Sequence, residues 1–371
     1  MGGSVRLGKI LGVTVQVHYT WFVALWALTF SLARGVFPEQ IPGLPPETYW
    51  TMGGVGAVLL FSSVLVHELG HALVARLYQI PTRSITLFLF GGVAHIAREP
   101  ERPAHEFSVA IAGPVTSLGL AGIFWALTPR GEPVPATALM GYLAWANLLL
   151  AAFNMLPAFP LDGGRVLRAI LWAFYGYERA TRIVTLLGQT TAGAFILLGV
   201  VGVFTGRVLN GLWLILIGWF LEQAASASYQ QAVLRRILGG IRVADIMTRE
   251  VRVMPAELTL EEAVHDYFLP HKHGGYPVVY GDRLVGILTL HDLRRVPRER
   301  WRTARVREVM TPLAQAKAVR PELSAYEALA RMLQDGVGRL LVVDEDGELV
   351  GLVTRSDLMH LIRVRTELGA D

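Results

Sequence analysis

The pentapeptide His67-Glu68-Leu69-Gly70-His71 lies within an otherwise apolar stretch that covers residues 51–79. A stretch of this length can cross a bilayer as a helix. Residues four apart share a helix face, so both histidines can present their imidazoles to one zinc ion. The glutamate between them then faces the open coordination position, where it can take a proton from water. The alternative is two buried histidines capped by their neighbours, although ionisable groups inside a membrane span are costly and usually functional.

A tetrahedral catalytic zinc needs a third protein ligand, and the apolar part of the chain offers few carboxylates. Asp162 is the one aspartate of residues 1–241, and it lies in the segment NMLPAFPLDGGR at 154–165. Two prolines precede it and two glycines follow it, which is typical of a bent segment that lines a cavity at membrane depth. Asp162 could instead cap the next helix. Beside the two histidines, we predict that it is the third ligand.

The composition indicates a membrane protein. Hydrophobic residues make up 53% of the 371 residues and charged residues 17%, with a mean hydropathy of +0.43. A soluble protein has about 25% charged residues, and a disordered chain has far fewer apolar ones. The net charge of +4 gives no indication of a nucleic-acid partner. The absence of cysteine excludes disulfides and thiolate metal ligands.

Charge is distributed unevenly along the chain. Residues 1–241 carry 15 of the 34 Lys and Arg and 10 of the 30 Asp and Glu, and residues 242–371 carry the remaining 19 and 20. The charged fraction therefore rises from roughly 10% to roughly 30%. We predict a membrane domain over residues 1–230, a linker over 231–242 and a soluble α/β region from 243 onward.

Six apolar spans of about 20 residues or more are expected in the membrane domain. They cover residues 15–34, 51–79, 105–128, 136–157, 181–205 and 208–229. Between the second and third spans, residues 85–90 and 93–97 predict a β-hairpin with Gly91-Gly92 at its turn. Open strand edges are not tolerated in lipid, so this hairpin should be re-entrant and sheltered by protein. The polar segment 1–12 does not predict a cleavable signal peptide.

The basic residues predict the orientation of the spans. With the N-terminus inside, the inner segments of the membrane domain carry 12 Lys and Arg, and the outer segments carry three, Arg34, Arg130 and Arg207. Basic residues concentrate on the cytoplasmic side of membrane proteins. Because the number of spans is even, the N-terminus and the soluble region should both be cytoplasmic.

The soluble region contains an internal repeat. The segment GILTLHDL at 286–293 returns as GLVTRSDL at 351–358. In each copy a helical pattern and two short strand patterns precede this segment. The repeat predicts two similar α/β modules in tandem.

Over most of residues 1–230 the chain resembles the site-2 protease family of intramembrane zinc metalloproteases, peptidase family M50. The resemblance rests on HELGH at 67–71, GG at 91–92, AGP at 112–114 and the segment 154–165. It implies one zinc ion per chain held by His67, His71 and Asp162, with Glu68 as the base. It also implies that Asn154 assists substrate or oxyanion binding. The implied activity is regulated intramembrane proteolysis in the cell membrane, on the transmembrane segments of other proteins.

Residues 243–298 and 306–364 resemble a tandem pair of CBS domains. The resemblance implies clefts for adenosine nucleotides, with Thr289, Asp292, Thr354 and Asp357 near the ribose, and it makes a homodimer through the pair possible. Threonine and aspartate at a helix start can bind ribose hydroxyls, and a helix N-terminus attracts phosphate. The alternative is that these residues only cap their helices.

Three functions fit these features: a zinc protease regulated by its CBS pair, a CBS-regulated transporter or channel, and an inactive scaffold. A transporter should carry polar groups along a path through its spans. Here the ionisable groups of the spans gather in one compact set with Glu68, which favours the protease. A membrane-spanning substrate would have to unwind, and we expect Phe90, Gly91, Gly92 and Val93 of the hairpin to receive it as an added β-strand.

Overall fold

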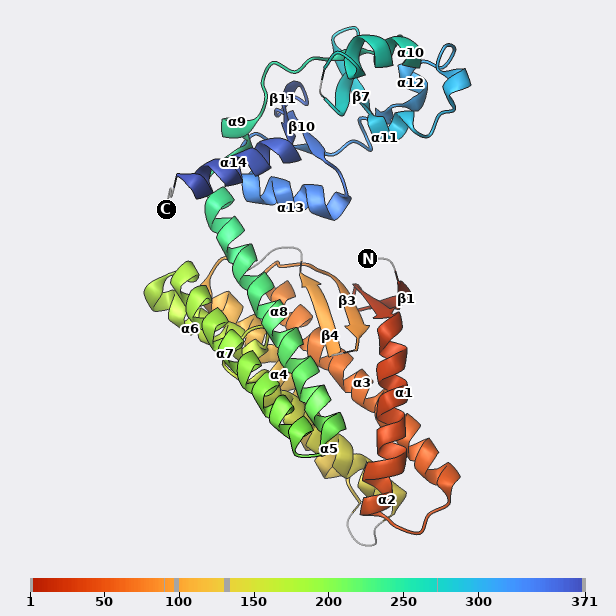
Figure 1. Cartoon of the computed structure of the whole chain (residues 1–371), viewed down its shortest axis with the longest axis vertical. Coiled ribbons are helices and arrows are strands. Elements are labelled where there is room, and N and C mark those ends of the chain that lie inside the picture. Colours follow the sequence, from red (N-terminus) through yellow and green to blue (C-terminus); the bar gives the residue numbers. More distant parts are fainter. Residues whose placement is uncertain (1–2, 90, 97–99, 130–133, 272, 369–371) are drawn as a thin grey trace. The chain divides into compact units, whose positions relative to one another are not determined.

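Six helices in the described part of the chain are long and apolar enough to cross a membrane, as the sequence predicts. The computed structural model describes residues 3–89, 91–96, 100–129, 134–271 and 273–368 (Figure 1). The first span, Tyr19–Gln40, comprises α1 (Tyr19–Ser31), a π-helical turn (Leu32–Val36) and α2 (Phe37–Gln40). The other spans are α3 (Pro46–Leu77), α4 (Pro103–Leu127), α5 (Pro135–Asn154), α7 (Tyr177–Phe204) and α8 (Val208–Gly239).

Large apolar side chains cover the outer surface of these helices. Trp26, Trp125, Leu186 and Leu197 are each between 61% and 68% exposed. Lipid solvates such a surface, whereas in water it would drive association. The chain is therefore a multi-pass membrane protein. It forms two units, Met1–Gln230 and Gln231–Asp371, and the boundary between them falls within α8.

A four-stranded sheet belongs to the membrane unit and lies at the end of the bundle where α1 begins (Figure 1). Its strands are β1 (Ser4–Ile10), β2 (Val13–His18), β3 (Thr82–Phe88) and β4 (Gly91–Ile96), in that spatial order. β1 and β2 form a hairpin, and β2 pairs with β3 in parallel. The expectation that the first span begins at residue 15 is wrong for residues 15–18, which are strand. The buried side chains of Val13, Val15 and Val17 alternate with partly exposed ones, as in a half-buried strand.

The predicted hairpin is present as β3 and β4, but its turn is not where the sequence analysis placed it. Phe88 pairs with Gly91, and Leu87 pairs with Gly92, so both glycines belong to β4. A Cβ atom at Gly92 would contact the side chain of Glu68 in α3. This close approach gives a reason for glycine at residue 92 other than a turn. Phe90 and Ala97 of the prediction lie outside the described residues.

A helix that is not among the six predicted spans follows the fourth span. α6 (Asp162–Tyr175) begins after a bent segment. A Cβ atom at Gly164 would lie 2.6 Å from the carbonyl carbon of Ala158, so glycine allows α6 to start directly on this segment. The start of α6 is thereby held at a fixed place in the bundle.

Small residues bring α7 and α8 into close contact. A Cβ atom at Gly199 would lie 2.6 Å from the carbonyl oxygen of Gly211, and one at Gly218 would lie 2.7 Å from that of Ala192. Close backbone approach through small residues is the usual way in which helices associate in lipid. The last two spans therefore pack as a tight pair.

The second unit contains the two predicted modules. Each module has its own apolar core, with Tyr276 and Leu288 in the first and Leu340 and Val353 in the second. The sheets have the orders β5-β6-β7-β8 and β11-β10-β9. The elements of the first module are β5 (Met254–Pro255), α10 (Leu260–Ala263), a π-helical turn (Val264–Phe268), β6 (Gly275–Tyr280), β7 (Arg283–Thr289), α11 (Leu290–Leu293), a 3₁₀ turn (Arg298–Arg300), α12 (Val306–Val309) and β8 (Thr311–Pro312). Those of the second are α9 (Val243–Ile246), β9 (Ala318–Val319), α13 (Ala325–Asp335), β10 (Arg339–Val343), β11 (Leu349–Thr354) and α14 (Arg355–Glu367).

Candidate metal centre

Two buried histidines project from the same face of α3. The Nδ1 atom of His67 lies 2.8 Å from Oγ of Ser117, and Nδ1 of His71 lies 2.7 Å from the carbonyl oxygen of Val109. A carbonyl can only accept, so His71 donates its Nδ1 proton to Val109, and Nε2 is the nitrogen available to bind a metal ion. Such a partner on the far nitrogen is the usual support of a metal-binding histidine. Helix α4 supplies both partners, and so it sets the orientation of both rings.

Asp162 completes a three-residue group with these histidines. Its Oδ2 atom lies 3.2 Å from Nε2 of His67 and 3.1 Å from Nε2 of His71, and the two Nε2 atoms are 3.3 Å apart. Zinc bonds of about 2.0–2.1 Å in a tetrahedron separate the ligand atoms by about 3.3–3.4 Å. The N-cap of α6 is Leu161 and Asp162 is its first residue, so the carboxylate is directed at the imidazoles and not at a cap. The donor set therefore fits zinc in chemistry and in spacing.

Gly113 provides the space in which the two Nε2 atoms meet. A Cβ atom at this position would overlap Nε2 of both His67 and His71. The residue lies in α4 between the two residues that hold the Nδ1 atoms. The glycine of the AGP motif thus allows α4 to pass directly behind the donor atoms.

Glu68 lies beside the donor group and against the sheet. It is half-buried, and a Cβ atom at Gly92 of β4 would lie 2.6 Å from Cγ of Glu68. Strand β4 therefore contacts the side chain that the sequence analysis predicts to be the base. The structure brings together His67, His71, Asp162, Glu68 and Gly92.

The other predicted site residues of the membrane unit are not part of the metal-ligand group. Asn154 is the last residue of α5 and is half-buried, and no side-chain hydrogen bond joins it to another described residue. Gly91 begins β4, and Val93 is 44% exposed on the same strand. Phe90 cannot be placed, because it lies outside the described residues.

A buried ion pair was not predicted from the sequence. Glu106 of α4 is fully buried and accepts hydrogen bonds from Nε and from a terminal nitrogen of Arg168 in α6. The guanidinium also donates to the hydroxyl of Tyr177 and lies over the ring of Phe159. The pair joins the helix that orients the histidines to the helix that carries Asp162. The two residues of this ion pair are 62 positions apart in the sequence, so no local sequence pattern predicts it.

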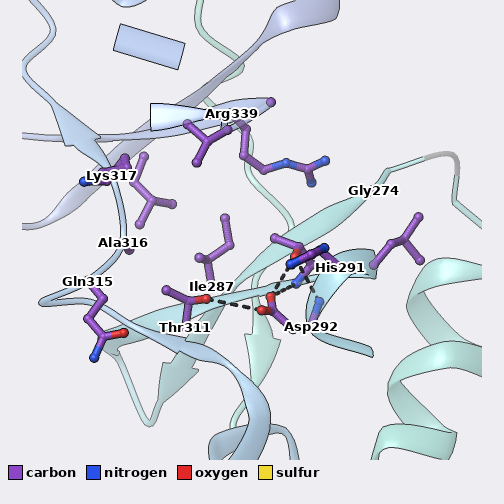
Figure 2. Close-up of a pocket in the computed structure, with 15 residues that line it drawn as sticks. Gly274, Ile287, His291, Asp292, Thr311, Gln315, Ala316, Lys317 and Arg339 are labelled. Carbon is purple, nitrogen blue, oxygen red and sulfur yellow. Dashed lines mark hydrogen bonds between the residues drawn. The ribbon is translucent and has the colours of Figure 1, made fainter. Parts of the chain in front are cut away.

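The four predicted nucleotide residues form two equivalent helix starts in the second unit. Thr289 and Asp292 make a reciprocal capping box at α11, and Thr354 and Asp357 make one at α14. Capping is thus one role of these residues. Each pair also lines a cleft between the two modules, of about 500 Å³ for the first pair and 290 Å³ for the second. Figure 2 shows the first of these clefts.

Known protein families match both units of the chain. The family model of peptidase family M50 matches residues 55–130 and 132–200, and the CBS domain model matches residues 243–299 and 306–364. The predicted ligands, the base and the hairpin glycines all lie within the ranges of the first model. The four capping residues lie within the ranges of the second.

Relatives that match nearly the whole chain are zinc metalloproteases by name. The chain is 38% identical over 370 residues to zinc metalloprotease Rip3 of Mycobacterium tuberculosis, with 98% of this chain and 94% of that protein covered. It is 30% identical over 377 residues to a zinc metalloprotease of Methanocaldococcus jannaschii, with 99% of both covered. A solved site-2 protease from the same organism is 30% identical, with 61% of this chain and 95% of that chain covered and a TM-score of 0.43. The two relatives that match nearly the whole chain favour the protease over the transporter.

Proposed function

Because this chain belongs to peptidase family M50 and is a zinc metalloprotease of the site-2 protease type, we propose that His67, His71 and Asp162 hold its zinc ion and that Glu68 is its general base. One observation carries the assignment: the three donor atoms lie 3.1–3.3 Å apart. Both Nδ1 atoms have other partners, so both Nε2 atoms are directed into the site. One zinc ion per chain satisfies this donor set.

A bound zinc ion supplies Lewis acidity, which polarises a peptide carbonyl and makes water easier to deprotonate. Glu68 takes one proton from the attacking water as the new C–O bond forms. It then delivers that proton to the peptide nitrogen as the C–N bond breaks. Asn154 donates a hydrogen bond from its amide to the carbonyl oxygen, where negative charge develops. The products are a carboxylic acid and an amine, and the acid then loses its proton to water to become a carboxylate.

The substrate is the transmembrane segment of another membrane protein. A peptide bond within a helix is shielded by the helical hydrogen bonds, so the segment must become extended before it can react. Strand β3 is paired on both sides, with β2 and β4, which leaves β4 as the open edge beside Glu68. An extended segment adds to β4 along Gly91, Gly92 and Val93, after the Phe90 position. Val93→Pro would disrupt this strand and should abolish cleavage while zinc is retained.

The protein resides in the cell membrane with its N-terminus and CBS pair in the cytoplasm. The proposal is supported by the 12 basic residues of the inner segments against three in the outer ones. The CBS pair binds an adenine nucleotide, with Thr289 and Asp292 or Thr354 and Asp357 at the ribose, and thereby modulates proteolysis. A second copy of the chain can pair through the same modules.

The decisive experiment compares the wild-type protein with Glu68→Gln in detergent or nanodiscs. Zinc is measured by mass spectrometry, and cleavage is measured on a membrane protein with one transmembrane segment. We expect about one zinc per chain in both proteins, and cleavage slower by about 10²–10⁴-fold in the variant. Zinc should be lost in His67→Ala combined with Asp162→Ala.

Two results would contradict the proposal. Full zinc content in the double variant would remove the ligand assignment. Cleavage by Glu68→Gln at the wild-type rate would remove the assignment of the base. If neither result is found, proteomics of membrane fragments from cells with the wild-type protein or with Glu68→Gln would identify natural substrates.

A further inference from the structure

The two modules of the second unit differ at one structurally equivalent position. Arg339 at the start of β10 pairs with Thr354, and Gly275 at the start of β6 pairs with Thr289. These threonines are equivalent in the repeat, so Arg339 and Gly275 are equivalent too. The first module has no side chain where the second has a guanidinium.

The guanidinium of Arg339 occupies the space that this glycine leaves. A Cβ atom at Gly275 would overlap one terminal nitrogen of Arg339, and one at Gly274 would lie 2.7 Å from the other. No arginine could stand at residue 275 with Arg339 in this position. The pair of modules therefore holds one guanidinium where exact symmetry would place two.

Arg339 lies in the wall that separates the two clefts. The first cleft contains Thr289 and Asp292, the second contains Thr354 and Asp357, and both are lined by Gly274, Gly338 and Arg339. In Figure 2 the Arg339 side chain extends over the first cleft, across from Asp292 and Thr311. The shared wall consists of two glycines and one charged side chain.

The charge of Arg339 has no counter-ion within the described part of the chain. Neither an ion pair nor a hydrogen bond joins its guanidinium to another described residue. Burial lowers the pKa of Arg339, as expected for a cation removed from water. A half-buried guanidinium of this kind is a ready partner for a phosphate group.

The other charged groups of the two clefts do not replace it. In the first cleft, the ammonium of Lys317 is paired with a carboxylate, since its Nζ atom lies 3.6 Å from Oδ1 of Asp335. Asp292 adds a negative charge to the same cleft. In the second cleft, Arg252 is accompanied by two carboxylates, Glu250 and Asp357. Without Arg339, each cleft therefore has little or no net attraction for a phosphate.

We propose that Arg339 is a single anion-binding group shared by the two clefts, so that a phosphorylated nucleoside in one cleft excludes a second from the other. The inference rests on the proposed nucleotide binding by the CBS pair. Either ribose site can be occupied, but one guanidinium serves one phosphate group at a time. The binding ratio is one nucleotide per chain, although two clefts are present.

The test is equilibrium dialysis of the full-length protein in detergent with radiolabelled AMP, ADP and ATP. Each cleft is blocked separately by a bulky residue at a position that lines only that cleft: Gln315→Trp for the first and Ser356→Trp for the second. Both positions are exposed, so the substitutions should not disturb a core. We expect one nucleotide per chain in the wild type and in each single variant, and none in the double variant.

A second arm removes the shared charge. Arg339→Ala should weaken binding by about tenfold or more. The matched control is Arg302→Ala, which removes an exposed arginine paired with Glu261 and lines neither cleft. This control should bind as the wild type does.

Each other outcome overturns the inference in a recognisable way. Two nucleotides in the wild type, with one in each single variant, would mean independent clefts. Loss of all binding in one single variant alone would mean that only one cleft is functional. Wild-type affinity in Arg339→Ala would remove the role of the guanidinium. If the wild type binds no adenine nucleotide at millimolar concentration, the proposed nucleotide function fails as well.

Discussion

Gly92 in strand β4 lies directly against Glu68 in helix α3, where a Cβ atom would come within 2.6 Å of Glu68 Cγ. The edge of the sheet and the predicted base are therefore in contact without any intervening side chain. A peptide that pairs with β4 would therefore lie close to the carboxylate of Glu68. This contact relates the strand that we propose receives the substrate to the residue that we propose transfers the proton.

Gly92→Ala should impair catalysis while leaving the metal in place. The added methyl group must displace either the Glu68 side chain or β4, and a misplacement of about 1 Å can cost about 10²-fold in rate. Cleavage of a model transmembrane substrate and zinc content are measured together. The control is Gly122→Ala in α4, where an added Cβ meets no atom within 4 Å. Unchanged cleavage in Gly92→Ala would show that this close contact does not matter.

Gly113→Ala should remove the metal although residue 113 is not a ligand. The methyl group would occupy the space where Nε2 of His67 and His71 meet, so the rings could not keep the donor spacing. We expect zinc content to fall from about one per chain to near zero. Gly119→Ala is the control, because its Cβ would lie in open space on the same helix. Full zinc retention would mean that α4 can move away at little cost.

Ser117→Ala should weaken zinc binding without abolishing it. The variant removes the group that holds Nδ1 of His67, and loss of such an outer partner typically lowers metal affinity by about 10–100-fold. Competition with a chelator measures the change. Ser108→Ala is matched to it, since that serine bonds only the backbone of Ala104 on the exposed side of α4. Equal affinities in the two variants would count against the support of His67 by Ser117.

Removing one partner of the buried ion pair should lower the stability of the membrane unit. Arg168→Gln leaves the Glu106 carboxylate buried without its counter-ion, which costs about 3–5 kcal/mol. Thermal unfolding in detergent reports the loss. Glu106→Gln combined with Arg168→Gln should be less destabilising than the sum of the single variants. Additive effects would mean that the two side chains do not act as a pair.

The spans and the predicted ligands could be read from the sequence because their signals are local. An apolar run of some 20 residues marks a span wherever it occurs. Histidines at positions i and i+4 share a face of any helix, which places His67 and His71 together before any tertiary contact is known. Asp162 could be added because aspartate is rare in the apolar part of the chain.

The features that were missed depend on distant partners or on short patterns. The alternation of Val13, Val15 and Val17 is brief and runs directly into α1, so it was included in the first span. Gly92 was assigned to a turn because the sequence does not show that Glu68 lies next to it. Alignment of Gly274-Gly275-Tyr276 with Gly338-Arg339-Leu340 would have revealed the asymmetry of the two modules.

The position of β4 at the edge of the sheet also has a consequence for the lengths of the cleavage products. Successive residues of a strand face opposite sides, so a peptide on β4 that slips by one residue turns its other face toward Glu68. A slip of two residues restores the original face. Alternative cuts in one substrate should therefore yield fragments that differ by two residues, a spacing that the masses of the released peptides would record.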